Sequence, residues 1–286
     1  MNAMDESQFG EDAVIRDIFS RIGTQNKWCI ELGALNGTHH SNTRSLIREQ
    51  GWSAVLIEAD PTYFEKLSEV YRDTPQAYPV QRFISFEGPD RLDAVLAETP
   101  IPKEPDLFSL DIDGNEYHVW ESLTEYAPRA IVVEFNPSIP NDVTFTQPRD
   151  MKVFQGSSLR ALAELGKKKG YELVATNETN GFFVRAEYLP RFELPDNSVE
   201  ALRTDHQFET RLYQLYDGTL KIAGFDRLFW HNIPIDEAKL QILPERKRAY
   251  PARISDRTLV RSFKYWARRS PLYGFVQRLR RLISRL

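Results

Sequence analysis

Between about residues 10 and 190, short apolar runs alternate with amphipathic stretches along this chain. Short apolar runs bounded by turn residues are typical of parallel strands that are buried on both faces. Such strands are expected at residues 28–32, 54–58, 80–84, 107–111 and 130–135, and a helix is expected at 62–71. The repetition predicts an α/β fold with a doubly wound, mostly parallel sheet.

The end of this region follows a different pattern. A helix predicted over 159–169 precedes two apolar runs, 171–176 and 182–185, which are separated only by the polar residues 177–181. Two strands joined by so short a turn pair antiparallel. A mostly parallel, seven-stranded sheet that closes with an antiparallel hairpin is typical of the Rossmann-like fold of class I methyltransferases, and less so of dinucleotide dehydrogenases.

Composition divides the chain into three segments. Residues 1–190 form the predicted α/β domain, and residues 191–256, rich in Pro, Asp and aromatic residues, are expected to be an irregular extension packed on its core. Residues 257–286 hold eight Arg, one Lys and no acidic residue, so they carry +9 and leave −13 for the rest of a chain whose net charge is −4. This basic tail is predicted to form a C-terminal helical extension of two amphipathic helices.

A glycine-containing loop follows the first expected strand directly. It runs from Glu31 through Gly33 to Gly37 in the order E-x-G-x-x-x-G, which differs from the G-x-G-x-x-G order of dinucleotide dehydrogenases. Glycine permits a sharp turn and a close approach to a ligand. Glu58 ends the second expected strand, where an acid can accept hydrogen bonds from both hydroxyls of a ribose. Together these features predict a site for S-adenosylmethionine, with Glu31 helping to hold its amino group.

Several segments match the pattern of a known family: Ser7–Asp12, Glu31–Gly33, Ser41–Thr43, Ile57–Asp60, Asp111–Tyr117, Val133–Asn136 and Gly181–Arg185. On these residues the chain, over roughly residues 7–190, resembles the FkbM-type family of methyltransferases. The resemblance implies a class I fold, S-adenosylmethionine as cofactor, and O-methylation, often of sugars or natural products. The better-known members have Lys-Ile-Asp-Val-Glu-Gly where this chain has Leu-Asp-Ile-Asp-Gly-Asn at residues 110–115, so the catalytic group does not carry over.

Acidic side chains follow two neighbouring strands of the predicted sheet. Asp111 and Asp113 come after the fourth strand, and Glu134 and Asn136 end the fifth. Ligands of open α/β sheets bind at the carboxyl ends of the strands. One carboxylate could be the general base for an acceptor hydroxyl. Alternatively, Asp111, Asp113 and Glu134 could hold Mg²⁺ or Ca²⁺, and a similar Asp-rich turn is found in metal-dependent sugar O-methyltransferases. In a third interpretation, Asp111 and Asp113 form the turn before Gly114 and touch only the cofactor.

Histidine is a competent base near neutral pH. His39 and His40 follow the glycine loop, and His118 lies just beyond the acidic turn, where its ring could reach an acceptor. Asp111, Asp113 and His118 are therefore the candidate catalytic residues. Most histidines serve as surface or packing residues, so packing is the alternative role for each.

The basic tail and the remaining composition bear on partners. An apolar face with Trp266 and Phe275 under a row of arginines suits the surface of an anionic membrane. Docking on the acidic domain or binding to another protein is an equal alternative, and nucleic acid is disfavoured because the rest of the chain is acidic. An acidic N-terminus, the single Cys29 and no apolar run of ~20 residues predict a cytoplasmic protein, peripheral on the inner membrane face if the tail binds lipid.

The leading hypothesis is an S-adenosylmethionine-dependent O-methyltransferase that acts on a small-molecule or glycan acceptor, such as a saccharide or a lipid-linked saccharide. A metal-assisted form of the same reaction is the second hypothesis. The third is a non-catalytic scaffold within a biosynthetic complex. The presence of Glu31, Gly33, Gly37 and Glu58 argues against a scaffold, since a dead site has no need of them.

Overall fold

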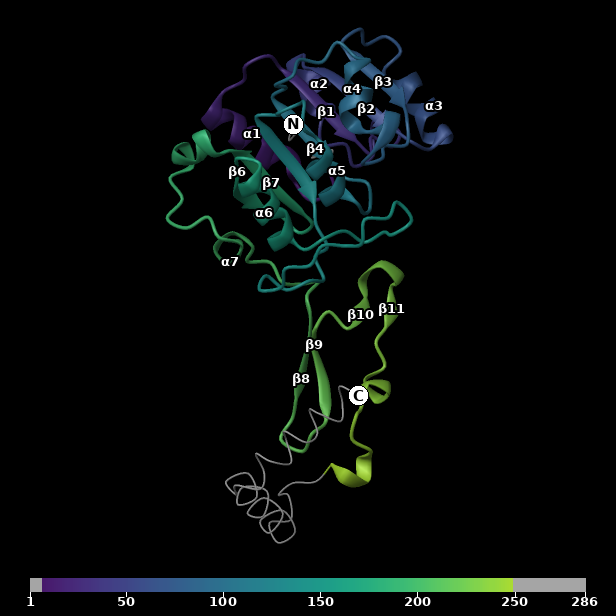
Figure 1. Ribbon diagram of the computed structural model, residues 1–286, viewed down its shortest axis with the longest axis vertical. Helices are drawn as coiled ribbons and strands as arrows, with labels where there is room; N and C mark the ends of the chain where they lie inside the picture. The colour runs from purple at the N-terminus through teal and green to yellow at the C-terminus, as the bar shows by residue number, and fades with distance from the viewer. Residues whose placement is uncertain (1–6, 249–286) are drawn as a thin grey trace, which may run out of the picture. The chain divides into compact units, whose positions relative to one another are not determined.

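The computed structural model describes residues 7–248, and the basic tail predicted at 257–286 lies outside the described residues. The chain divides into two compact units, with the boundary between Thr210 and Arg211. The first contains the sheet and its helices (Figure 1). It also contains residues 191–210, the beginning of the segment that was expected to be an irregular extension, and Phe192 and Val199 of this segment are buried in its two hydrophobic cores.

Seven strands form the sheet of the first unit, in the order β3-β2-β1-β4-β5-β7-β6. Strands β1 to β5 are parallel, and β7 runs antiparallel to both of its neighbours. The strands are β1 (Trp28–Leu32), β2 (Ser53–Glu58), β3 (Ala77–Gln81), β4 (Leu107–Leu110), β5 (Ala130–Glu134), β6 (Tyr171–Thr176) and β7 (Asn180–Arg185). This is the strand order of the Rossmann-like class I methyltransferase fold, and it confirms the predicted fold class.

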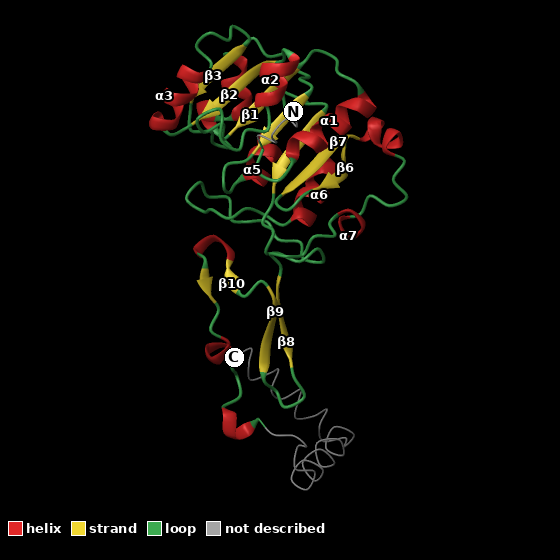
Figure 2. Ribbon diagram, turned by 180° about the vertical axis from the view of Figure 1, so that it is seen from behind, coloured by secondary structure: helices red, strands yellow, loops and turns green. Residues whose placement is uncertain are grey.

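Helices cover both faces of this sheet (Figure 2). They are α1 (Glu11–Ile22), α2 (Arg44–Gln50), α3 (Pro61–Val70), α4 (Leu92–Ala97), α5 (Glu116–Ser122), α6 (Leu159–Lys168) and α7 (Val199–Leu202). Cys29 and Leu56 pack in a core with α1, α2 and α3, whereas Ile30 and Val55 pack in a core with α4, α5 and α6. Successive strand residues point to opposite faces, so continuous apolar runs are what a sheet covered on both faces requires.

Two element boundaries differ from the expected ones for local reasons. The strand expected at 80–84 is β3 at 77–81, because it pairs with β2 only as far as Glu58 and Gln81. Phe83, which belonged to the expected strand, is 58% exposed. Helix α3 starts at Pro61, since Asp60 accepts hydrogen bonds from the N–H groups of Thr62 and Tyr63, and proline is favoured in the first helical position.

The second unit contains two small two-stranded sheets. One joins β8 (Thr210–Gln214) to β9 (Leu220–Gly224), and the other joins β10 (Arg227–Leu228) to β11 (Ile233–Pro234). Large apolar side chains such as Tyr216 and Ile242 are exposed on it. Among the described residues of both units, none of the helices has the length and apolar character needed to span a membrane.

Candidate active site at the carboxyl edge of the sheet

The loop after β1 is bonded closely to both neighbouring strands. The N–H groups of Gly33 and Ala34 donate to the Ile57 carbonyl at 3.1 Å, and the N–H of Asp111 donates to the Leu32 carbonyl at 3.1 Å. Gly33 has a φ of +89°, and a Cβ there would lie 1.7 Å from the carbonyl oxygen of Asp111. Only glycine fits this junction of β1 and β4, so the glycine predicted to approach a cofactor is also required by the sheet itself.

Glu58, the last residue of β2, faces the same loop. Its Oε2 accepts from the N–H of Leu35 at 2.8 Å and its Oε1 from the N–H of Asp60 at 2.7 Å. Each carboxylate oxygen can accept two hydrogen bonds, so each keeps one acceptor position. Gly37 lies further along the loop against α3, where a Cβ would come within 2.6 Å of Leu67. The loop and Glu58 are therefore held together before any ligand binds.

Glu31 is bonded to the segment that leads into α2. Its Oε1 accepts from the N–H of Asn42 at 2.7 Å, and its Oε2 accepts from the hydroxyls of Ser41 at 2.8 Å and Thr43 at 2.7 Å. The side chain is buried. The carboxylate thus joins β1 to the start of α2, and its predicted contact with the amino group of a cofactor stays a prediction.

Burial of Glu31 predicts a pH-dependent stability. Burial raises the pKa of Glu31 from 4.5 to about 7, although its hydrogen bonds oppose the shift. A carboxyl whose pKa is higher in the folded state stabilises the fold fully below its unfolded pKa, and this contribution is lost as pH rises through 7. The difference corresponds to about 3 kcal/mol. Urea unfolding from pH 4.5 to 8 should therefore show wild type losing up to about 3 kcal/mol relative to Glu31→Gln; parallel profiles would contradict this.

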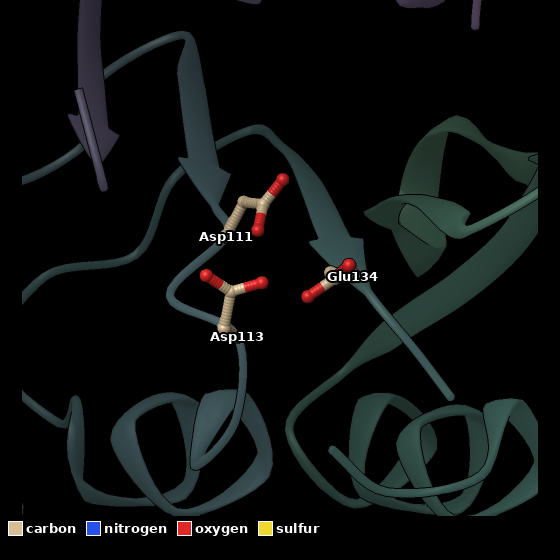
Figure 3. A group of neighbouring side chains, drawn as sticks. All are labelled: Asp111, Asp113 and Glu134. Carbon is tan, nitrogen blue, oxygen red and sulfur yellow. The ribbon is translucent and has the colours of Figure 1, made fainter. Parts of the chain in front are cut away.

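Three carboxylates meet beyond the ends of β4 and β5, as Figure 3 shows. Oxygen atoms of Asp111, Asp113 and Glu134 all lie within 4.8 Å of one another, and these three residues are called the acid group below. Asp111 follows β4, Glu134 ends β5, and the two strands are adjacent and parallel. The structure thus brings together the three residues that the sequence predicted to share a site.

The acid group concentrates negative charge at a partly buried position, in which Asp111 and Glu134 are half-buried and Asp113 is exposed. Burial, followed by the charge of Asp113, raises the pKa of Asp111 to about 6. Burial also raises the pKa of Glu134 well above its usual value, with the charges of Asp111 and Glu116 adding to the effect. Burial raises the pKa of Glu116 to about 8. Carboxyl groups held this close together favour a shared proton or a bound cation.

The turn that carries Asp113 is held in an uncommon backbone conformation. Asp113 has a φ of +57° and Asn115 a φ of +72°, which Asp and Asn tolerate better than other side chains. The Nδ2 of Asn115 donates to the carbonyl oxygens of Asp150 at 3.2 Å and Val153 at 2.9 Å. These two bonds to the loop of residues 150–153 fix the turn and hold Asp113 near Asp111 and Glu134.

Sequence reasoning missed three residues beside the acid group. Glu116 and Glu11 are each 1% exposed, and Asn180 is 3% exposed. Glu11 lies close enough to Asp111 to contribute to its raised pKa, although burial and the charge of Asp113 contribute more. Glu11 lies in a matched segment at the start of α1, which was a usable signal, whereas Asn180 could be placed only through the register of β7.

The histidines lie outside the acid group. The Nε2 of His118 is 2.8 Å from the carbonyl oxygen of Gln147, and its ring packs against Phe86 and Tyr117. The structure therefore places His118 in a packed, buried position, and its role as a base stays a prediction. His39 and His40 follow the glycine loop with ring centroids 3.6 Å apart, and burial together with His39 lowers the pKa of His40.

No protein-family model matches the chain, and no curated protein matches it by sequence. Similar solved structures include the N-terminal domain of EvdMO1 with SAH bound, at 12% identity over 61% of this chain and 80% of that chain, with a TM-score of 0.39. A SAM dependent methyltransferase from Aquifex aeolicus is 11% identical over 61% and 88%, with a TM-score of 0.38. The CurJ carbon methyltransferase is 10% identical over 62% and 54%, with a TM-score of 0.42. These are distant similarities, and the fold class of this chain is defined by its own strand order.

Proposed function

We propose that this chain is an S-adenosylmethionine-dependent methyltransferase that methylates a hydroxyl oxygen of its acceptor. The observation that carries the proposal is the position of its carboxylates relative to the strand order. The order reverses between β1 and β4, and ligands of open α/β sheets bind at such a switch point. Glu58 ends β2 on one side of it, and the acid group follows β4 and β5 on the other. The side of Glu58 suits a cofactor, and the side of the acid group suits an acceptor.

The residues around Glu58 fit the cofactor. The carboxylate has two free acceptor positions for the two ribose hydroxyls, and the loop of Gly33 and Gly37 is already bonded to it through Leu35. When bound, S-adenosylmethionine supplies an electrophilic methyl group. Asp111 borders both sides, because its carbonyl oxygen contacts Gly33 while its carboxylate belongs to the acid group.

The acid group fits a hydroxyl acceptor. Methyl transfer to oxygen requires that donor and acceptor be aligned and that the hydroxyl proton be removed. The carboxylate oxygens of Asp113 and Glu134 can accept this hydrogen bond and then the proton. We further propose a saccharide as the acceptor, because neighbouring hydroxyls of a sugar would donate to several of these oxygens at once. The resemblance to the FkbM-type family supports the same acceptor class.

A transfer assay tests this proposal. The full chain is incubated with methyl-labelled S-adenosylmethionine and a panel of acceptors that offer hydroxyl, amine or activated carbon groups. Label is expected in a saccharide as an ether that survives mild alkali. Glu134→Gln should lower the rate by about 100-fold, as loss of a general base does, whereas Asp142→Asn, an exposed residue on the next loop, should not. Label found only on nitrogen or carbon would contradict oxygen transfer.

A further inference from the structure

Near the acid group, the carboxylate of Glu116 has one oxygen that is buried and lacks a hydrogen-bond donor among residues 7–248. Glu116 begins α5, and its Oε1 accepts from the N–H groups of Ile112 at 3.2 Å and Gly114 at 2.6 Å. The oxygen without a donor in that part of the chain is Oε2. Ile112 and Gly114 are the residues on either side of Asp113, so these two hydrogen bonds hold the Glu116 carboxylate against the turn that carries Asp113.

Asn180 supplies a second oxygen of this kind. It lies directly opposite Glu134 in the antiparallel pairing of β5 with β7, and residues paired in this way project from the same face. Its Nδ2 donates to Glu11 at 3.0 Å and to Thr179 at 3.2 Å. Its Oδ1 is buried and unpartnered within the described part of the chain. A buried polar atom without a partner costs free energy unless a ligand satisfies it.

Within residues 7–248, no basic side chain forms an ion pair with the carboxylates of this site, which are those of Asp111, Asp113, Glu116 and Glu134. The buried Glu11 adds a further negative charge nearby. The two unsatisfied atoms, Oε2 of Glu116 and Oδ1 of Asn180, are both hydrogen-bond acceptors. The arrangement therefore suits a positively charged ligand that has no acceptor atoms of its own.

We propose that Asp111, Asp113 and Glu134 bind one divalent cation of the oxygen-preferring class of Mg²⁺, Mn²⁺ and Ca²⁺, with Glu116 and Asn180 closing the site around it. Ligands on opposite sides of one ion lie about 4.2 Å apart for Mg²⁺ and about 4.8 Å apart for Ca²⁺, which is twice the ion–oxygen distance. The carboxylate oxygens already lie within 4.8 Å of one another. Three oxygens at that limit surround a central point about 2.8 Å from each (4.8/√3), so the side chains need to move inward by no more than roughly 0.2–0.8 Å to reach the ion–oxygen distances of Ca²⁺ or Mg²⁺.

Coordination by three carboxylates leaves some of the coordination positions of the ion unfilled. These cations take about six or more oxygen ligands, so the acceptor hydroxyl can occupy one of the remaining positions. A bound cation lowers the pKa of a coordinated hydroxyl and holds it in place. This last step rests on the proposed methyl transfer, whereas the binding of the cation does not.

The test is a titration of the full, chelator-treated chain with MnCl₂, in which the electron paramagnetic resonance signal of free Mn²⁺ is followed. We expect one Mn²⁺ per chain, displaced by Mg²⁺ or Ca²⁺. Asp113→Asn should weaken binding by more than about tenfold, and Asn180→Ala by about tenfold. Asp113 is exposed and asparagine tolerates its positive φ, so this variant should fold, as its thermal melting would verify. Asp142→Asn, which changes an exposed acid outside the group, should bind as wild type does.

Two outcomes would overturn the proposal: folded wild type that binds no Mn²⁺, or equal Mn²⁺ binding by Asp113→Asn and Asp142→Asn. Calorimetry with S-adenosylhomocysteine on the same samples tests the cation site and the proposed methyl transfer independently of each other. A chain that binds Mn²⁺ but no S-adenosylhomocysteine keeps the cation site and contradicts methyl transfer. A chain that binds S-adenosylhomocysteine but no Mn²⁺ contradicts the cation site alone.

Discussion

Replacing Asp106 by alanine is expected to lower the free energy of unfolding by about 3–5 kcal/mol, the cost of removing one partner of a buried ion pair. Asp106 is fully buried immediately before β4. Its carboxylate accepts from the N–H groups of Gln25, Asn26 and Lys27 at 2.7 to 3.0 Å, and from Nη1 of Arg129 at 2.5 Å. The substitution would leave a buried guanidinium and three N–H groups without their acceptor.

Arg129 is held on its other sides as well. It donates to the carbonyl oxygens of Ile22 at 3.0 Å and Gly23 at 2.8 Å, and to the hydroxyl of Tyr188 at 2.9 Å. The pair thus joins the end of α1, β4 and β5 at the amino edge of the sheet. Because Arg129 is 4% exposed, solvent cannot replace the lost carboxylate.

Urea unfolding of three variants measures this contribution. In the double variant Asp106→Ala/Arg129→Met, part of the loss should be recovered, because no uncompensated charge remains, although the three N–H groups stay unpaired. Asp17→Ala removes the exposed pair of Asp17 with Arg21 and should cost no more than about 1 kcal/mol. A loss at Asp106 as small as that at Asp17 would contradict this account of the amino edge.

The sheet could be predicted from sequence because its strands are buried on both faces. Such strands require continuous apolar runs, and the well-buried β1 lies at the predicted residues. β3 was displaced, since its residues are only partly buried and its limits depend on pairing with β2. The Asp106–Arg129 pair could not be predicted, because charged residues beside a strand look the same in sequence whether they are exposed or bonded to a distant segment.

The acid group could be predicted because strand ends of a parallel sheet meet at one edge, which places Asp111 and Glu134 together once the strand order is known. Asn180 could not be predicted, because its position depends on the register of an antiparallel pair. Glu116 lies in a matched segment, but the turn that folds it back beside Asp113 has no signal in the sequence. Glu31 was interpreted only as a contact to a ligand, so its hydrogen bonds to residues 41–43 were not predicted. Sequence patterns thus locate a site through strand ends and miss side chains whose positions depend on a turn or on a pairing register.

Glu58→Ala is expected to weaken the binding of S-adenosylhomocysteine by at least about 100-fold. The carboxylate would lose hydrogen bonds to both ribose hydroxyls, each of which contributes about 1.5–3 kcal/mol when the acceptor is charged, and about 1.4 kcal/mol is a factor of ten in affinity. The substitution also removes the acceptors for the N–H groups of Leu35 and Asp60. Thermal melting of Glu58→Ala must therefore show that the loop keeps its fold, and a substitution at a neighbouring acid shows whether any disturbance at the end of β2 weakens binding.

Asp60→Ala provides that control. Asp60 caps α3 through the N–H groups of Thr62 and Tyr63, lies two residues from Glu58 and is exposed. Its removal should cost about 1 kcal/mol of stability while affinity for S-adenosylhomocysteine changes little.

Calorimetric titration of wild type, Glu58→Ala and Asp60→Ala with S-adenosylhomocysteine tests the cofactor site directly. Wild type and Asp60→Ala are expected to bind, and Glu58→Ala is expected to lose nearly all binding. A folded wild-type chain that shows no binding, or a Glu58→Ala variant that binds as tightly as wild type, would contradict the cofactor site at the end of β2.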